Sequence, residues 1–421
     1  MKKGYVQLDE VKVNKNRVEY YFSTSKDLEP FFKFYNSMFI EYDENIEAIP
    51  LSILVIPFVA NIMPLMWITN SVLWVRCIDS RYYNSLYRVR DRYQDMYYNY
   101  KLGGTLIAAK VVENKYDVKR SSALLFSGGL DAISTSIRIA NENPMLINIY
   151  GWYNDCIEQN DVFDSDEKNI YEFARNNKLD KQFVKSNFAT IINANKIDQK
   201  YKKKIGDSWW HGFQHGMCFI GHAIPLAYKY NIEKIYIASS FTMGGERKSC
   251  ASDPAVDIEV KFASGRVIHD GIELSRQDKV KLVVQRQKEL NDKYILKVCS
   301  FNEKNCCKCE KCFRTILGLV AEGVSRKELS KFGFNEIDTN LYEYYTKVMN
   351  ESIHLFGIER ESKIHWPDIK KRMISNKDNI IEKEFVEWFL NYNFISVRKK
   401  AIMRYRIKNI VPIIKRKILG K

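Results

Sequence analysis

The chain has 421 residues, of which 46% are hydrophobic, so it is long and apolar enough for two or three folded domains and is not intrinsically disordered. Its formal net charge is +15, but residues 398–421 hold ten Lys and Arg and no acidic residue, which leaves +5 for the rest. The body of the protein is therefore only mildly basic, which disfavours a nucleic-acid-binding protein.

Residues 1–118 are expected to form a separate N-terminal α+β domain. The start of the chain turns acidic where a secretory signal would become apolar, so we expect a cytoplasmic protein. Alternating apolar residues over 3–23 predict a β-hairpin that turns at residues 14–16. A Tyr- and Arg-rich helix is expected around 80–100. That helix could stack on RNA bases or simply expose a solvated flank.

Residues 49–75 carry no charge and are long enough to cross a bilayer. Prolines at 50, 57 and 64 each remove a backbone donor and disfavour a continuous helix, and Asn61 adds polarity. We therefore expect a buried, proline-broken core segment here, with a membrane span as the alternative.

Residues 119–298 alternate between strand-like and helix-like patterns. The candidate strands are 123–126, 145–150, 182–186 and 234–239, and the candidate helices are 131–141, 165–178 and 211–230. This alternation predicts an α/β domain whose parallel sheet is covered by helices on both faces. Ligands of such sheets bind beyond the carboxyl ends of the strands.

The sequence ALLFSGGLDA, at 123–132, contains the strongest functional motif. An apolar strand runs into Ser127, Gly128, Gly129, Leu130 and Asp131, and a helical pattern follows. Strand, glycine turn and helix N-terminus together aim backbone N–H groups at a phosphate. An acidic residue in the same turn fits if a metal ion lies between it and the phosphate. The motif favours a nucleotide site over an ordinary turn.

A cysteine cluster is the second motif. Cys306, Cys309 and Cys312 are spaced as CxxCxxC, and Cys299 lies seven residues upstream. Four thiolates at this spacing predict a closed tetrahedral zinc site with a structural role, while Cys307 is expected to point away. An iron–sulfur cluster and free redox thiols are the alternatives. Nine cysteines with this clustering favour a reducing compartment.

The two motifs in this order resemble the 7-cyano-7-deazaguanine synthase group of PP-loop ATP pyrophosphatases. The resemblance covers roughly 121–325 and includes Arg314 beside the cysteines. It implies an adenine nucleotide α-hydrolase-like fold (the HUP class) that binds ATP and Mg²⁺. In that chemistry a substrate carboxylate attacks the α-phosphate, pyrophosphate leaves, and ammonia or an amine displaces AMP to give an amide or nitrile.

The resemblance also assigns roles to single residues. Residues 127–131 would cradle the pyrophosphate, with Asp131 acting through Mg²⁺. Arg276 and Lys279 would supply cationic side chains there, and Tyr150 and Gly151 would lie near the adenosine. One position departs from the family, because Ala132 stands where a serine is usual. One hydroxyl contact is therefore missing, and Ser134 comes two residues too late to replace it.

The substrate side is less specific. His211, His215 and His222 fall at i, i+4 and i+11, which places them on one helical face. We name His211 and His215 as candidates for lining the substrate pocket, with simple packing as the alternative. In the loop that follows the strand at 234–239, Glu246, Arg247, Asp253 and Asp257 are candidates, of which Asp253 before Pro254 is preferred.

The expected organisation is then an N-terminal α+β domain at 1–118, a nucleotide-binding α/β domain at 119–298, a zinc-binding segment at 299–325, a helical region at 326–397 and a basic amphipathic tail at 398–421. The expected partners are ATP and a small-molecule or peptide carboxylate. Three interpretations of the tail stay open: peripheral contact with an anionic membrane surface, contact with nucleic acid, and a solvated helical extension. Two other functions stay open: an RNA-modifying PP-loop enzyme that adenylates a base carbonyl, and a nucleotide-binding partner protein without turnover.

Overall fold

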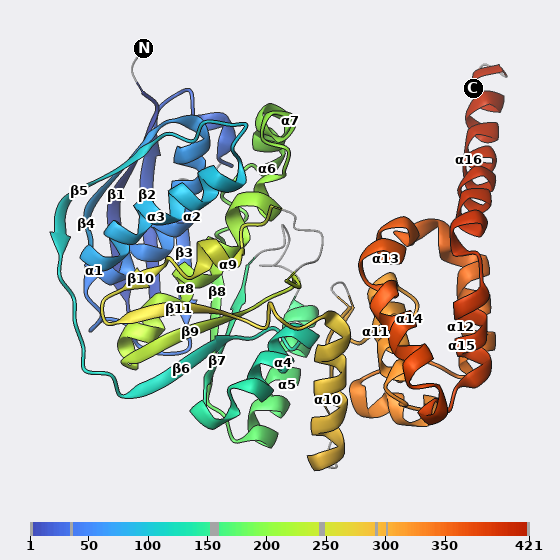
Figure 1. Ribbon diagram of the computed structural model, residues 1–421. Coiled ribbons are helices and arrows are strands. Elements are labelled where there is room, and N and C mark those ends of the chain that lie inside the picture. Colours follow the sequence, from blue (N-terminus) through green and yellow to red (C-terminus); the bar gives the residue numbers. More distant parts are fainter. Residues whose placement is uncertain are drawn as a thin grey trace. The chain divides into compact units, whose positions relative to one another are not determined.

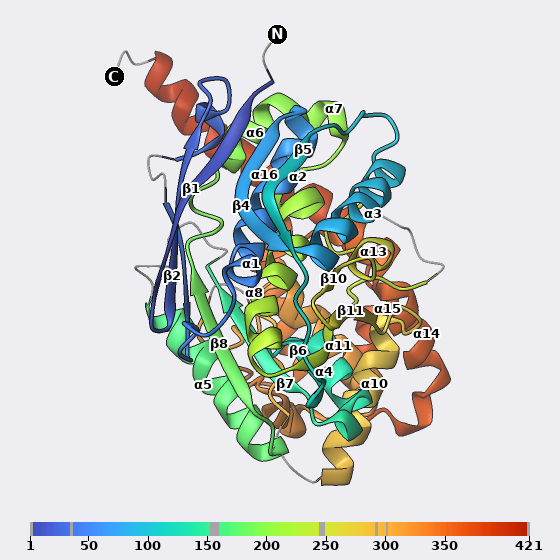
Figure 2. The same cartoon turned by 90° about the vertical axis from the view of Figure 1, so that its left-hand side faces the viewer.

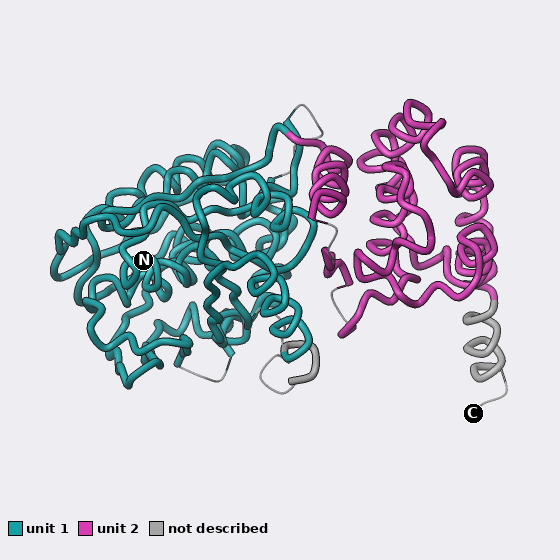
Figure 3. The backbone as a smooth tube through the Cα atoms, turned by 90° about the horizontal axis from the view of Figure 1, so that it is seen from below, with its two compact units in different colours: residues 1–273 teal, residues 274–421 magenta. Residues whose placement is uncertain are grey.

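The computed structural model describes residues 3–33, 37–151, 160–243, 249–290, 294–299 and 302–418, without the side chains of 160–163 and 408–418. The chain divides into two compact units, residues 1–273 and residues 274–421 (Figure 3). The first unit holds a large, mostly parallel β-sheet with helices, and the second is helical. The protein is therefore of the α/β class.

Among the described residues, eleven strands form one sheet in the order β10-β11-β9-β6-β7-β8-β3-β2-β1-β4-β5 (Figures 1 and 2). In chain order the strands are β1 Tyr5–Asn14, β2 Arg17–Thr24, β3 Ser37–Tyr42, β4 Val72–Asp79, β5 Thr105–Val112, β6 Arg120–Leu125, β7 Met145–Tyr150, β8 Lys181–Ser186, β9 Ile232–Ala238, β10 Lys261–Phe262 and β11 Gly265–Asp270. The expected hairpin is confirmed as the antiparallel pair β1–β2, and the four strands expected in the α/β region are β6, β7, β8 and β9.

Strand β6 is the centre of the parallel part. It pairs in parallel with β7 on one side and with β9 on the other, and β8 and β11 extend the two sides in parallel. When the five parallel strands β6, β7, β8, β9 and β11 are numbered along the chain, their order across the sheet is 3-2-1-4-5. The chain therefore adds strands on one side of β6 first and on its other side, beginning with β9, afterwards. Such a reversal in strand order opens a crevice at the carboxyl ends of β6 and β9, where ligands of open α/β sheets bind.

The helices of the first unit cover this sheet. They are α1 Leu51–Leu54, α2 Ile56–Thr69, α3 Ser80–Met96, α4 Leu130–Arg138, α5 Asn160–Asn177, α6 Ala194–Ile197, α7 Lys203–Ile205, α8 His215–Lys229 and α9 Pro254–Asp257. The β6–α4–β7 and β7–α5–β8 connections move in one direction, and the connection through α8 to β9 moves back. Right-handed crossovers therefore place α4 and α5 on one face and α8 on the other.

The apolar stretch 49–75 forms the core of the first unit. Helices α1 and α2 fill Leu51–Thr69, a span long and apolar enough for a membrane helix, but 94% of its window is buried inside the fold. Helix α2 packs against α8 and continues through Pro64, so the expected break occurs only at Val55, before Pro57. The expectation of a buried core segment is borne out, because this helix is enclosed by the sheet and by α8.

The expected boundary near residue 118 is wrong. Strands β1 to β5 belong to the same sheet as the parallel strands β6 to β9, because β3 pairs antiparallel with β8 from Ile40–Ser186 to Tyr42–Val184. The N-terminal segment thus supplies hydrogen-bond partners for the outer edge of β8. The division falls instead between Glu273 and Leu274, so residues 274–298 lie with the cysteine segment.

The second unit consists of the helices α10 Arg276–Leu290, α11 Glu310–Ala321, α12 Leu341–Ser352, α13 Ile358–Ile364, α14 Trp366–Ser375, α15 Lys383–Asn391 and α16 Phe394–Ile418. Its core is aromatic, with Phe313 of α11 in ring contact with Tyr345, Trp366 and Phe389. The described part of the basic tail is helical, because α16 extends from Phe394 to Ile418. Arg398 Nη1 bonds Glu359 Oε2 at 2.6 Å, which attaches the start of the tail to α13.

Asn61 is a fully buried polar residue within α2. Its Nδ2 donates to Phe188 O at 3.0 Å, and its Oδ1 accepts from Gln214 Nε2 at 2.8 Å and Cys218 Sγ at 3.0 Å. One side chain therefore joins α2 to the segment after β8 and to α8. Buried polar groups need such partners, since an orphaned one costs about 1–3 kcal/mol.

We predict that Asn61→Leu lowers the unfolding free energy of the first unit by about 2–4 kcal/mol, because it removes the buried hydrogen bonds to Phe188, Gln214 and Cys218 and leaves the Phe188 carbonyl and the Gln214 amide with only their mutual bond at 3.4 Å. Urea denaturation followed by tryptophan fluorescence measures the change. The control is Asn45→Ala at an exposed position, which should change stability by less than about 0.5 kcal/mol. Equal effects of the two variants would contradict the bridging role.

Candidate functional site

The candidate phosphate loop (residues 126–131) follows the central strand β6 and begins α4. Phe126 is held at both backbone groups: its N–H donates to Ile147 O at 2.8 Å, and its carbonyl accepts from Asn148 Nδ2 at 2.9 Å. Ser127 is exposed, and Gly128 has a φ of 71°, which favours glycine. Gly129 is the extended N-cap of α4. No side chain therefore caps the start of α4, and the N-terminus of a helix is a place where anions bind.

Helix α4 is fixed in place from its other end. Thr135 Oγ1 donates to Asp270 Oδ2 at 2.8 Å, and Arg138 Nε contacts the same carboxylate at 3.1 Å. Asp270 ends β11, so the helix is tied to the edge strand of the parallel group. Ala132 and Ser134 are buried in α4, and the Ser134 hydroxyl has no hydrogen-bond partner. Ser134 therefore faces the protein interior, and no hydroxyl replaces the one that Ala132 lacks.

Tyr150 and Gly151 end the neighbouring strand β7. Tyr150 is buried, and Gly151 has a φ of 134°. A Cβ on Gly151 would overlap the carbonyl oxygen of Ser186, so only glycine fits at this position. This close approach explains Gly151 as a packing residue at the strand end, and its contact with adenosine stays a prediction.

The two expected cationic residues lie on α10 of the second unit. Arg276 Nη2 donates to Thr315 Oγ1 at 3.4 Å, and Lys279 is 3% exposed. Their action on the phosphates stays a prediction.

Asp253 has a structural role in the described fold. Its carboxylate accepts from Ala255 N at 2.9 Å and so caps α9, where Pro254 occupies the first helical position. Asp253 is 2% exposed, so its burial and its capping bond explain its position in the fold without any contact to a substrate. Asp257 is also buried and bonds His269 Nδ1 at 2.8 Å. Glu246 and Arg247 lie outside the described residues.

His211 and His215 lie side by side, with ring centroids 6.2 Å apart. His211 lies within a π-helical turn, Trp210–Gln214, and His215 follows that turn as the first residue of α8; such turns are frequent at functional sites. His222, expected on the same face, is fully buried and contacts Ser186 Oγ at 3.2 Å, and burial lowers its pKa to about 4. It is therefore a neutral core histidine.

The His–Cys cluster, defined as Asp207, His211, His215 and Cys250, was not foreseen from the sequence. Cys250 Sγ lies 3.5 Å from His215 Nε2, and His211 Nδ1 lies 3.1 Å from both carboxylate oxygens of Asp207. Two glycines permit this packing, since a Cβ on Gly212 would crowd Asp207 and one on Gly216 would overlap the carbonyl of Ala251. The histidine pair was the available signal; the cysteine is 35 residues away from His215.

Electrostatics within the cluster favour the charged forms. The hydrogen bond to Asp207 raises the pKa of His211 to about 10. Burial would raise the pKa of Cys250, but hydrogen bonds from His211 and His215 outweigh it and lower the pKa to about 7. Burial also acts against protonation of His215, yet the Cys250 thiol raises its pKa. A thiolate with imidazolium neighbours is thus substantially populated at neutral pH, unlike an ordinary thiol.

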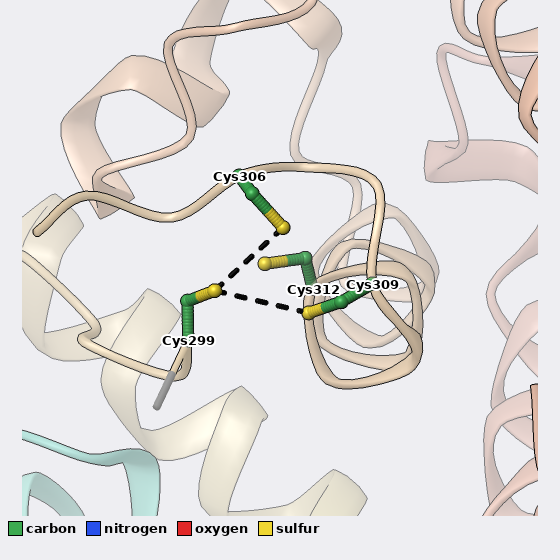
Figure 4. A group of neighbouring side chains, drawn as sticks. All are labelled: Cys299, Cys306, Cys309 and Cys312. Atoms are coloured by element: carbon green, nitrogen blue, oxygen red, sulfur yellow. Dashed lines mark hydrogen bonds between the residues drawn. The ribbon is translucent and has the colours of Figure 1, made fainter. Parts of the chain in front are cut away.

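Four cysteine side chains of the second unit point toward one another (Figure 4). The sulfur atoms of Cys299, Cys306, Cys309 and Cys312 all lie within 4.8 Å of one another. Cys299 Sγ is 3.6 Å from Cys306 Sγ and 4.0 Å from Cys309 Sγ. Zinc–sulfur bonds of about 2.3 Å in a tetrahedron give sulfur separations of about 3.8 Å, so the four thiols could hold a metal such as zinc.

The protein supports these thiols from several directions. Asn305 Oδ1 accepts from Val298 N and Cys299 N at 3.0 and 3.2 Å, and Asn302 Nδ2 donates to Cys299 Sγ at 3.1 Å. Cys309 is the N-cap of α11, and Cys312 lies in its first turn, where the helix dipole favours thiolates. The Cys307 thiol instead contacts Asn305 O at 3.6 Å, so it points away as expected.

Arg314 lies two residues beyond the last cysteine and forms an ion pair with Glu361 of α13 at 2.7 Å. Both side chains are largely buried, and burial raises the pKa of Glu361 to about 7 despite the arginine. The pair therefore joins α11 to α13 and has a structural role.

Comparisons with protein-family models, with curated proteins and with solved structures give no match for this chain. We therefore infer a function from the residues of the phosphate loop and of the two cysteine-containing sites.

We predict one zinc ion per chain by elemental analysis. Cys306→Ser should abolish zinc retention and destabilise the second unit, because three ligands cannot close a structural tetrahedron. Cys307→Ser is the matched control, and it should keep the metal. An iron–sulfur absorption band, or equal zinc loss in both variants, would contradict a zinc site formed by these four thiols.

The His211–Asp207 pair predicts a stability effect with a defined sign. Because the pKa of His211 is raised in the fold, its ion pair contributes fully to the unfolding free energy below pH 6.5, the pKa of a free histidine. This contribution is lost as the pH rises toward about 10, where folded His211 loses its proton. We therefore expect His211→Gln to lower the melting temperature at pH 6 and to have little effect at pH 10. Thermal unfolding of both proteins across this range measures it, and a difference that grows with pH would be the wrong sign.

Proposed function

We propose that this protein is an ATP-dependent enzyme of the PP-loop type, which adenylates a substrate carboxylate, releases pyrophosphate and joins the acyl group to ammonia or an amine. The observation that carries the proposal is the phosphate loop at the carboxyl end of the central strand, beside the reversal in strand order. That order also supports an adenine nucleotide α-hydrolase-like fold. The free thiols among the described residues fit a cytoplasmic enzyme.

In the proposed reaction, the loop binds the departing pyrophosphate. The uncapped N-terminus of α4 and the backbone beside Gly128 offer N–H donors to its oxygens. Asp131 lies in the first turn of α4, where it would hold Mg²⁺, and the ion would neutralise charge on the phosphates. The acyl-adenylate then loses AMP to the nitrogen nucleophile.

The four-cysteine site has a separate role in this proposal. A zinc ion with four thiolate ligands has no open position for water or substrate, so it would stabilise the second unit and take no part in the reaction. The substrate-side proposal retains His211 and His215, whereas the capping contact of Asp253 gives that residue a structural function.

Ala132 supports a second candidate, a nucleotide-binding protein without turnover. Residue 132 lies in the first turn of α4, directly after Asp131, and lacks the hydroxyl usual in the resembling family. If this candidate is correct, ATP binds but no pyrophosphate is released with any acid tested, and Ala132→Ser restores release.

We predict that ATP with Mg²⁺ binds the full chain and that Asp131→Asn weakens binding by roughly tenfold or more, because the metal loses its carboxylate ligand. Isothermal titration calorimetry measures both affinities, and Asp117→Asn on the exposed chain before β6 is the control. With a panel of small acids and peptides, the enzyme should form AMP and pyrophosphate. ADP and phosphate as products would exclude this reaction.

A further inference from the structure

Cys250 is a nucleophile-type side chain that the adenylation step does not use. It is 6% exposed and lies between two histidines, with its backbone N–H directed at Met96 Sδ of α3 at 3.2 Å. Another buried thiol, Cys218, differs sharply. Its Sγ donates to Asn61 Oδ1 at 3.0 Å, and burial raises its pKa well above the usual value. The surroundings of Cys250 are therefore specific to that residue.

The hydrogen bonds of His215 determine which ring nitrogen faces the sulfur as a base. His215 Nδ1 lies 2.9 Å from the carbonyl oxygen of Trp210, and a carbonyl can only accept, so Nδ1 carries the hydrogen. In neutral His215, Nε2 then has its lone pair free toward Cys250 Sγ at 3.5 Å. This is the arrangement in which an imidazole takes the proton of a thiol.

His211 contributes the second cation and is held by Asp207. The Asp207 carboxylate accepts from Ser249 Oγ at 2.9 Å, from Tyr97 Oη at 3.2 Å and from Ser208 N at 2.7 Å, in addition to His211. Ser249 precedes Cys250, so one carboxylate fixes both the histidine and the cysteine segment. Asp207 is thus a positioning residue, which acts on the thiol through His211.

Other charged or titratable groups near the sulfur do not form a metal site with it. Tyr93 and Tyr97 of α3 and the buried Asp257 lie close enough to interact electrostatically within this cluster. Among the described residues, the group of ligand atoms close enough to hold a metal is the four-cysteine site, and the His–Cys cluster is not part of it. The cluster thus has the makeup of a covalent nucleophile and not of a metal centre.

Topology places this nucleophile at the edge of the sheet where the phosphate loop lies. Strands β6 and β9 pair in parallel, so the loop after β6 and the segment after β9 leave the sheet at the same edge. Helix α8 returns antiparallel to these strands in its crossover, so its N-terminal residue His215 also lies toward that edge. The loop, His215 and the Cys250 segment all belong to the first unit.

We propose that Cys250 is a covalent nucleophile that accepts the acyl group from the adenylate before the nitrogen nucleophile does; this step rests on the proposed function. The sulfur attacks the acyl carbon, a C–S bond forms, and the C–O bond to AMP breaks with its electron pair leaving on AMP. His215 gives its proton to water. The amine then attacks the thioester, a C–N bond forms, the C–S bond breaks, and His215 takes the proton of the amine as the thiolate is restored.

The thiolate is tested without any substrate. Iodoacetamide should alkylate Cys250 with a midpoint near pH 7, because His211 and His215 hold its pKa near that value. At pH 7 we expect labelling at least about tenfold faster than at the half-buried Cys77, whose pKa is raised by burial. Peptide mapping separates the sites. His215→Gln, His211→Gln and Asp207→Asn should each move the Cys250 midpoint upward toward that of an ordinary thiol, near pH 8.5.

Acyl transfer is tested with acetyl adenylate, which bypasses ATP. The full-length protein should gain one acetyl group on the Cys250 peptide, and neutral hydroxylamine should remove it. Cys250→Ser should remain unlabelled with an unchanged melting temperature, whereas the control Cys77→Ser should be labelled like the unaltered protein. Because His211 is about half exposed, His211→Gln gives a second variant that preserves the buried side of the cluster.

The outcomes separate this inference from the proposed function. An ordinary Cys250 midpoint, or no hydroxylamine-sensitive acetylation at Cys250, overturns the nucleophile even if pyrophosphate is released from ATP. Normal acetylation of Cys250 with no pyrophosphate release under any acid supports the nucleophile and counts against the adenylation step alone.

Discussion

Parallel hydrogen bonding of β6 to both β7 and β9 is the constraint on which the rest of the first unit depends. A central parallel strand must be covered on both faces, since its neighbours are reached by crossovers that carry helices. Because the chain leaves β6 toward β7 and later returns toward β9, the crossover helices lie on opposite faces. The N-termini of α4 and α8 then point to one edge of the sheet from its two faces, which is the edge at which ligands of open α/β sheets bind.

The N-terminal segment makes this arrangement stable. It continues the sheet beyond β8 and supplies α2, whose apolar side chains pack against α8. The Asn61 network then ties α2 to α8 and to the segment after β8 by hydrogen bonds that the surrounding apolar core makes costly to break. A segment that composition alone would let cross a membrane thus holds the helix that begins with His215.

Sequence patterns predicted the features that depend on local chemistry. The hairpin at 5–24, the apolar runs of β6 and β7 and the spacing of the four cysteines each express a local requirement, namely turn residues, burial or ligand geometry. The pairing of strands that are distant in the sequence has no comparable local pattern. The antiparallel contact of β3 with β8 joins residues about 146 positions apart, for example Ile40 and Ser186, and so the expected domain boundary was misplaced. Cys250 was missed for the same reason, because its partner His215 is brought to it only by the π-helical turn and the loop after β9.

The proposed function requires the loop at Ser127–Asp131 to bind the phosphates of ATP. A crystal structure of the protein with Mg²⁺ and α,β-methylene-ATP, which cannot be cleaved between those phosphates, tests it most directly. We expect the triphosphate to lie against the backbone N–H groups of this loop and the start of α4, and the metal to be bound to Asp131. A nucleotide bound away from the carboxyl end of β6, or a loop that stays empty at saturating analogue, would contradict it.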